Sequence, residues 1–168
     1  YRFSHDRVQE AAYASIPSDM RGPDHLRIGR LLAARVPELG HDETVFDVPN
    51  QLNRAAGLIT SPAERESLAE HNLAAGLRAQ AAAAYASALN YFASGVALLT
   101  EDSWRSRGEL AFSLTFHLAE CEFVAGRAAE AERRLSALQQ RAETASQGAA
   151  VTRLRSEILV TLGNNDQA

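Results

Sequence analysis

The sequence of 168 residues contains no lysine, so all 17 of its basic residues are arginines. This absence removes the lysine that binds phosphates in P-loop and kinase ATP sites, and the lysine that forms Schiff bases. The formal net charge is -4, which leaves no surplus of positive charge for phosphates or anionic lipids. We therefore expect a chain that is not itself an enzyme of these classes and that binds neither nucleic acid nor a membrane.

Cysteine and glycine are also scarce. The single cysteine, Cys121, cannot pair within the chain or supply a zinc cluster, which fits a reducing compartment. No two glycines stand closer than seven positions, which excludes a G-x-G-x-x-G loop, and no G-x-S-x-G nucleophile motif occurs. The five histidines follow no metal-binding spacing. We predict no catalytic residue, no cofactor-binding residue and no metal site.

Long hydrophobic runs are missing as well. No stretch approaches the roughly 18 apolar residues of a membrane span, and no segment has the pattern of a signal peptide. These features predict a cytoplasmic protein. Because 46% of the residues are hydrophobic, the chain still has enough apolar side chains for a folded core.

The composition predicts an all-α fold. Alanine, leucine, arginine and glutamate dominate, and no segment alternates β-branched or aromatic residues with polar ones. Ser61, Pro62 and Glu64 have the spacing of a helix N-cap. The expected helices are residues 4–15, a helix starting at Pro23, a segment 42–59 kinked or split at Pro49, and 62–78, 81–98, 104–125, 128–144 and 149–162.

A weak internal repeat predicts how these helices pack. In a tetratricopeptide (TPR) unit, a turn residue lies five positions before the small residue that opens the second helix. Gly126 and Ala131 have this spacing, as do Ala83 with Ala88 and Gly163 with Ala168. We predict stacked antiparallel hairpins in a TPR-like right-handed solenoid over residues 61–168, in which the last residues open a further unit. Residues 1–60 form a separate helical segment, and the pattern leaves open whether it packs as repeats.

The same register predicts a partner-binding groove on the first helices of the hairpins. Its predicted residues are Leu73, Gln80, Phe116, Phe123, Arg153 and Glu157. An alternative for the two phenylalanines is ordinary core, because aromatic residues at helical spacing are usually buried. We expect Cys121 to be a small buried hydrophobic residue, and Glu130 with Arg134 to be a solvated surface pair.

Several segments resemble, in order, a region of large bacterial signalling proteins. They begin with Phe3–Ile16 (FSHDRVQEAAYASI), and continue with His25–Leu32 (HLRIGRLL), Phe46–Arg54 (FDVPNQLNR), Ala84–Phe92 (AYASALNYF), Glu109–Leu114 (ELAFSL) and Ala119–Phe123 (AECEF). Proteins of the family that these segments resemble contain, in order, a serine/threonine kinase, a STAND-type P-loop ATPase, helical repeats, a GAF sensor and a histidine kinase. Pro49, and Gly22 with Pro23, depart from its pattern.

The resemblance implies a non-catalytic position between the ATPase and the kinase. Residues 1–60 would be the end of the ATPase module or a linker, and no catalytic residue of the family maps onto this sequence. We expect a protein-interaction and signal-coupling module whose partners are other domains of its chain or other proteins. Exposed apolar ends would favour a homodimer. The alternatives are the sensor arm of a STAND-type transcriptional regulator and a stand-alone enzyme with a cleft near Glu70 and His71.

Overall fold

The computed structural model describes residues 17–39 and 45–165, and every regular element in these ranges is a helix. The all-α prediction is therefore confirmed for this part of the chain. The chain forms two compact units, unit 1 (Tyr1–Thr60) and unit 2 (Ser61–Ala168). The predicted helix at residues 4–15 and the predicted role of Ala168 lie outside the described residues.

Unit 1 contains the helix α2 (Ser18–Leu39), the short helix α4 (Asp47–Leu52) and the 3-10 helix η1 (Asn53–Leu58). The two α-helices meet at Gly29, where a Cβ atom would lie 2.3 Å from Cδ2 of Leu52. Close by, the buried His25 ring places Nδ1 2.7 Å from Oε1 of Gln51. Since only glycine allows this approach, Gly29 decides where α4 packs on α2.

Two expectations for prolines in unit 1 were wrong. Pro23 does not start its helix, because α2 begins five residues earlier at Ser18. Pro49 does not split its segment either. It is the third residue of α4, where a missing N–H costs no intrahelical hydrogen bond, and the change of helix type comes at Asn53 instead.

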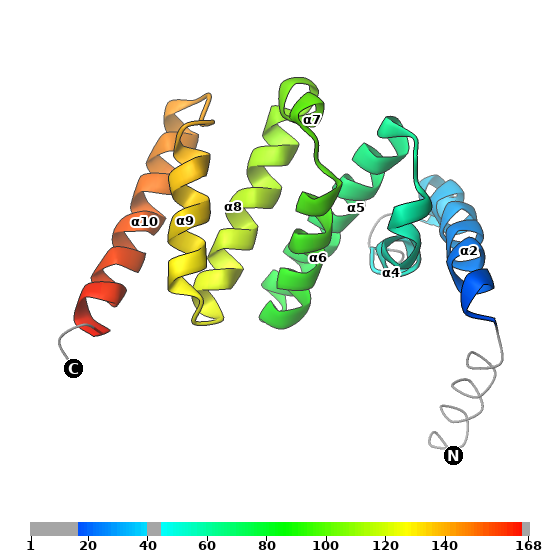
Figure 1. Ribbon diagram of the computed structural model, residues 1–168, viewed down its shortest axis with the longest axis horizontal. Coiled ribbons are helices and arrows are strands. Elements are labelled where there is room, and N and C mark those ends of the chain that lie inside the picture. Colours follow the sequence, from blue (N-terminus) through cyan, green and yellow to red (C-terminus); the bar gives the residue numbers. More distant parts are fainter. Residues whose placement is uncertain (1–16, 40–44, 166–168) are drawn as a thin grey trace, which may run out of the picture. The chain divides into compact units, whose positions relative to one another are not determined.

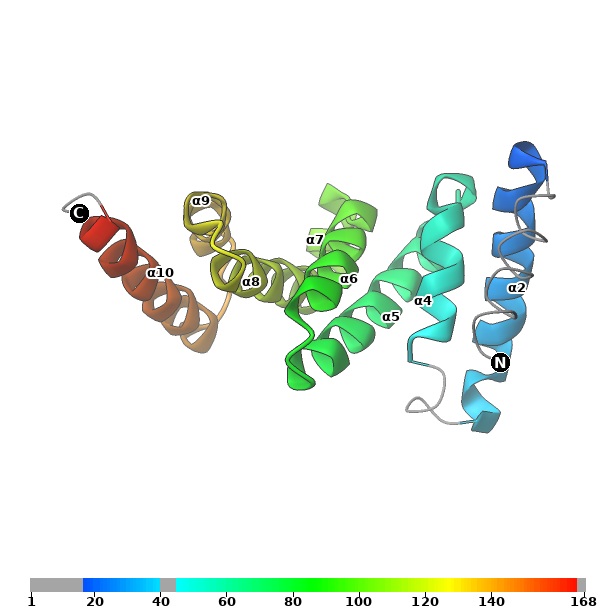
Figure 2. The ribbon, with the colours of Figure 1, turned by 90° about the horizontal axis from the view of Figure 1, so that it is seen from below.

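Unit 2 consists of six helices in the described part of the chain. They are α5 (Pro62–Ala81), α6 (Tyr85–Leu98), α7 (Glu101–Ser106), α8 (Gly108–Val124), α9 (Ala128–Gln139) and α10 (Ala145–Asn165). Hairpins α5/α6 and α8/α9 pack side by side, and α10 packs on α9 (Figure 1). Helices α5, α8 and α10 lie on one side of unit 2, and α6 and α9 lie on the other (Figure 2).

The start of unit 2 agrees with the sequence. Ser61 is the N-cap of α5, its Oγ accepts a hydrogen bond from the backbone N–H of Glu64 at 3.4 Å, and Pro62 is the first helical residue. These polar groups satisfy donors that a helix leaves unpaired at its N-terminus. The predicted N-cap is confirmed.

The two hairpin turns have the same backbone. Ala83 and Gly126 both have positive φ values, 57° and 77°. In each turn the N–H of the next residue bonds back five positions, from Ala84 to Ala79 O at 2.9 Å and from Arg127 to Glu122 O at 2.8 Å. This is the Schellman arrangement, which ends a helix and reverses the chain. The turns are therefore equivalent, 43 residues apart.

The buried faces repeat with the same spacing. In α5 the buried positions are Leu68, Ala69, Asn72, Ala75, Gly76 and Ala79, and each has a buried counterpart 43 residues later in α8. A buried polar residue that hydrogen-bonds within its own helix also recurs at equivalent positions. The amide of Asn72 donates to Leu68 O at 2.9 Å, and the hydroxyl of Thr115 donates to Ala111 O at 2.7 Å. Each polar group is thus satisfied within its own helix.

Two predictions for unit 2 were wrong. The segment 104–125 is not one helix, because Arg107 (φ -136°, ψ 46°) separates α7 from α8, and α7 has its own capping box from Thr100 and Ser103. Gly163 does not form a third turn either. It lies within α10, and the described residues contain no following helix that would require the chain to reverse at this position.

Candidate functional site

A polar cluster of unit 2 joins the first helices of its two hairpins, α5 and α8. Glu120 of α8 lies at its centre. Its Oε2 accepts a hydrogen bond from Nε2 of Gln80 on α5 at 3.4 Å and lies 2.7 Å from Nδ1 of His117. Arg153 of α10 is near enough to act on Glu120 electrostatically. We call Gln80, His117, Glu120 and Arg153 the Glu120 cluster. It connects α5, α8 and α10.

The pKa of Glu120 reflects these neighbours. Burial by itself raises the pKa of this carboxyl, since desolvation disfavours the charged form. The hydrogen bond from His117, the charge of His117, the hydrogen bond from Gln80 and the charge of Arg153 act in the opposite direction and prevail. The pKa of Glu120 therefore lies below its ordinary value, and the carboxylate is the stable form in the folded protein.

A hollow of about 450 Å³ lies further along α5 and α8. At its rim Arg107 forms an ion pair with Glu70 and lies 4.0 Å from Glu66, whose Oε1 accepts a hydrogen bond from Ser106 at 3.3 Å. The lining combines apolar and polar side chains: Glu70, Leu73, Ser106, Arg107, Gly108, Glu109, Leu110 and Ser113.

The residues of the predicted groove have different surroundings in the structure. Leu73 lines the hollow and Gln80 belongs to the Glu120 cluster. Arg153 and Glu157 form an exposed pair on α10 at 2.8 Å. The structure thus brings Gln80 and Arg153 toward one carboxylate, and their role in binding a partner stays a prediction.

Both phenylalanines of the predicted groove are half-buried. Phe116 and Phe123 pack against the hydrophobic core of α8, α9 and α10. The ring of Phe116 stacks on that of Phe112, with centroids 6.1 Å apart, and meets the His117 ring edge-on at 5.7 Å. Both rings therefore contribute to the core and also keep an accessible part.

Sequence reasoning missed the central residue of the site. Glu120 and His117 are three positions apart, which places them on one face of a helix, and this spacing was the available signal. Their contact with Gln80 could not be predicted, because it joins residues 40 positions apart.

Two ion pairs link neighbouring helices of unit 2. Arg134 of α9 holds the buried Glu122 of α8 through two hydrogen bonds of 2.8 and 2.7 Å. Arg155 of α10 binds Glu132 of α9 in the same forked way, with Nε donating to Oε2 at 3.2 Å and Nη2 donating to Oε1 at 2.7 Å. The expected solvated pair of Glu130 and Arg134 was wrong, because the longer reach across the hairpin satisfies a buried carboxylate.

Cys121 is fully buried between the helices, as expected of a small hydrophobic residue. Burial raises the pKa of its thiol to about 11, with smaller contributions from Glu120 and Glu122. Within residues 17–39 and 45–165, no three histidine, cysteine, aspartate or glutamate side chains gather as a metal site would require. None of the helices in these ranges has the length and hydrophobicity needed to cross a membrane.

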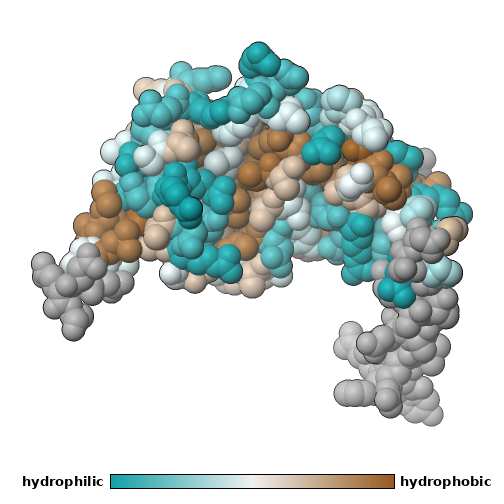
Figure 3. Space-filling model, in the orientation of Figure 1, coloured by the Kyte–Doolittle hydropathy of each residue, from teal (hydrophilic) through white to brown (hydrophobic). Residues whose placement is uncertain are grey.

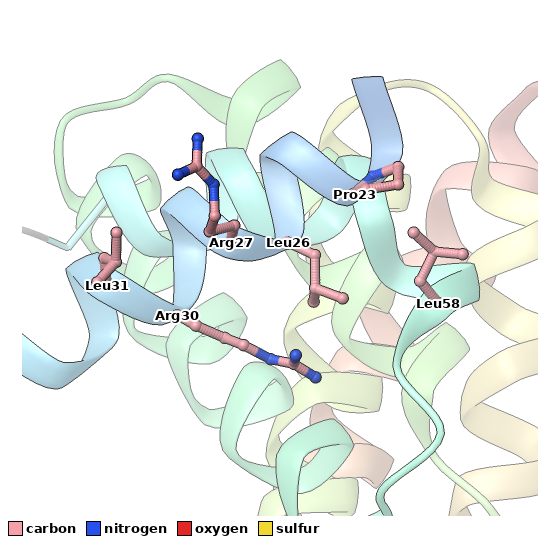
Figure 4. Close-up of a pocket in the computed structure, with 6 residues that line it drawn as sticks. All are labelled: Pro23, Leu26, Arg27, Arg30, Leu31 and Leu58. Atoms are coloured by element: carbon pink, nitrogen blue, oxygen red, sulfur yellow. The ribbon is translucent and has the colours of Figure 1, made fainter. Parts of the chain in front are cut away.

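Unit 1 has a hollow of its own, of about 540 Å³, between α2 and η1. Leu26 and Leu58 lie on its facing sides, and the guanidinium groups of Arg27 and Arg30 extend in different directions from α2 (Figure 4). Pro23 and Leu31 complete the lining. The hollow is apolar with two arginines at its edge, and it contains no group that suits acid–base chemistry.

The sequence is similar to part of a signal-transduction kinase. It is 27% identical over 167 residues to the hybrid signal transduction histidine kinase G of Dictyostelium discoideum. This match covers 85% of the chain and 5% of the length of that protein. The chain matches no protein-family model, and no solved structure matches it. The chain is thus a distant relative of one region of a large signalling protein.

Proposed function

We propose that the chain is a non-catalytic helical-repeat module, built as a TPR-like right-handed solenoid, that binds partner segments and couples signals in a large cytoplasmic ATPase and histidine kinase protein. The observation that carries the proposal is the 43-residue repeat of turns and buried faces in α5/α6 and α8/α9. Stacked hairpins of this kind present extended surfaces. The distant similarity to a signalling histidine kinase supports the cellular role.

The binding surface in this proposal is the face of α5, α8 and α10. It carries Leu73 in a hollow, the Glu120 cluster, and the accessible parts of Phe116 and Phe123. Carboxylates there accept hydrogen bonds, and apolar side chains between them supply contact area. A partner segment with basic and apolar side chains would complement such a surface.

Coupling requires that the helices move as units. In our proposal, the Glu120 cluster transmits a change in the position of α5 to α8 and α10, because the Glu120 carboxylate on α8 accepts a hydrogen bond from Gln80 on α5 and is attracted by the charge of Arg153 on α10. A partner that binds one spacing of these helices better than another would shift the population toward it.

The test uses the intact parent protein and its kinase output. Gln80→Ala and Arg153→Ala remove surface groups of the Glu120 cluster without opening the core. We expect both variants to change autophosphorylation at least severalfold while circular dichroism and the unfolding midpoint stay the same. Arg133→Ala, an exposed change on α9, is the matched control and should leave the output unchanged.

An unchanged kinase output in both variants, with the fold intact, would overturn the coupling proposal. Binding is tested separately, with the purified kinase segment of the parent as the probe. Leu73→Glu should weaken its binding about tenfold or more, and equal affinity of this variant and the natural chain would overturn the assignment of the surface.

A further inference from the structure

Helix α10 carries the repeat pattern of a first helix, but the described residues, which end at Asn165, contain no second helix to complete its hairpin. The hydroxyl of Thr152 donates to Gly148 O at 2.8 Å, as Thr115 donates to Ala111 O and Asn72 to Leu68 O. Thr152 stands 37 residues after Thr115. The same shift of 37 residues aligns the rest of α10 with α8.

The aligned positions differ sharply in burial. In α8, Ala111, Thr115, Ala119 and Glu122 are buried, and two of them contact α9, Ala119 in the shared hydrophobic core and Glu122 through Arg134. Their counterparts in α10 are Gly148, Thr152, Ser156 and Leu159, and the last three are exposed, with Leu159 52% accessible. The face that is buried in α5 and α8 is therefore exposed to solvent in α10.

The far end of α10 adds apolar surface to this face. Val160 is 64% accessible, and hydrophobic side chains gather at the C-terminal end of α10 on the surface shown in Figure 3. Gln139 of α9 reaches the start of this face, where Oγ1 of Thr152 donates to its Oε1 at 3.4 Å, while Ser156, the counterpart of Gly76 and Ala119, is small and exposed. Exposed apolar side chains that gather on one face are typical of a docking surface.

We infer that this face of α10 is the docking site for one more amphipathic helix of the same polypeptide, packed as α6 packs on α5 and α9 on α8. The repeat spacing near the end of the sequence supports a segment of the same polypeptide as the docked helix. Gly163 and Ala168 stand 37 residues after Gly126, which turns the chain, and Ala131, which is buried at the start of α9. In the structure Gly163 lies within α10, so docking requires the last turn of α10 to unwind at this glycine. The inference does not depend on the signalling role.

The experiment extends the 168-residue chain directly after Ala168 with a copy of residues 132–141. This extension keeps the register, so the copies of Leu135 and Leu138 reach the α10 face as the originals reach α8. The matched control carries glutamate in place of both copied leucines. A third protein combines the apolar extension with Leu159→Glu in α10. Hydrogen exchange of the amides of residues 148–161 and the thermal midpoint are measured for all three and for the unextended chain.

With the apolar extension we expect about tenfold or greater slowing of exchange in α10 and a midpoint higher by on the order of 5 °C. The glutamate control and the Leu159→Glu protein should match the unextended chain. Equal behaviour of the apolar and control extensions would overturn the inference. A dimer of the unextended chain that Leu159→Glu dissociates would also overturn it, because the occupant would then be a second copy.

Discussion

Replacing Gly76 by alanine tests how closely the helices of the first hairpin approach. A Cβ atom at this position would lie 2.3 Å from Cε1 of Phe92 and within 2.7 Å of two further ring atoms. Phe92 is fully buried in α6, so its ring could move away only by displacing other core side chains. The methyl group would force α5 and α6 apart.

Two effects of opposite sign decide the magnitude. Overpacking a dense core costs about 1 to 3 kcal/mol, and contacts this short place the cost near the upper end. Alanine gains up to about 1 kcal/mol over glycine in a helix interior. We expect Gly76→Ala to lower the free energy of unfolding by about 2 kcal/mol.

The single tryptophan, Trp104, makes the measurement specific to unit 2. Urea unfolding followed by Trp104 fluorescence gives the free energy of unfolding from the midpoint and the slope. Gly163→Ala is the matched control, since it lies in α10 with nothing within 4 Å of a Cβ atom. That change should stabilise the protein slightly, by about 0.5 to 1 kcal/mol if α10 unfolds with unit 2.

A second variant isolates the cause. In a Phe92→Leu background the ring is gone, so Gly76→Ala should cost close to nothing or become stabilising. If Gly76→Ala costs the same about 2 kcal/mol with and without the ring, the contact with Phe92 is not the reason for the glycine.

Three further predictions concern a turn, an ion pair and a titrating group. Ala83 has a left-handed backbone, so Ala83→Gly should stabilise unit 2 by about 1 kcal/mol in urea unfolding, and Gly126→Ala in the equivalent turn should destabilise it by a similar amount. A loss of stability in Ala83→Gly, or a gain in Gly126→Ala, would contradict the equivalence of the turns. Arg134→Ala leaves the buried Glu122 without its forked partner and should cost about 3 kcal/mol, whereas the exposed Arg133→Ala should cost nearly nothing, and similar losses for both would show that burial of Glu122 is unimportant. The pKa of Glu120 is lower in the folded chain than its ordinary value of 4.5, so its contribution to stability is present above that pH and is lost as the pH falls through the folded value. Glu120→Gln should therefore be less stable than the natural chain at pH 7, and this difference should shrink as the pH is lowered below 4.5. A difference that stays constant down to the acid unfolding of both proteins would refute the assignment.

The sequence by itself determined the helical class and the positions of several helix ends. Helix-forming side chains act locally, and so do caps such as Ser61 with Glu64, which is why they can be predicted without the fold. The register of Ala83 with Ala88 and of Gly126 with Ala131 was also visible, because small residues at a crossing follow from packing geometry alone. The start of α7 was within reach too, through the Thr100 capping box, but the break at Arg107 between α7 and α8 was not.

Only the tertiary structure decided which side chains meet. Gln80 and Glu120 are 40 residues apart, and Arg134 could have paired with Glu130 on its own helix as easily as with Glu122 across the hairpin. Burial settles such choices, since an ion or polar group removed from water must find a partner wherever one lies within reach. Burial of a face likewise depends on the neighbouring helix, so equivalent residues are dry in α8 and exposed in α10.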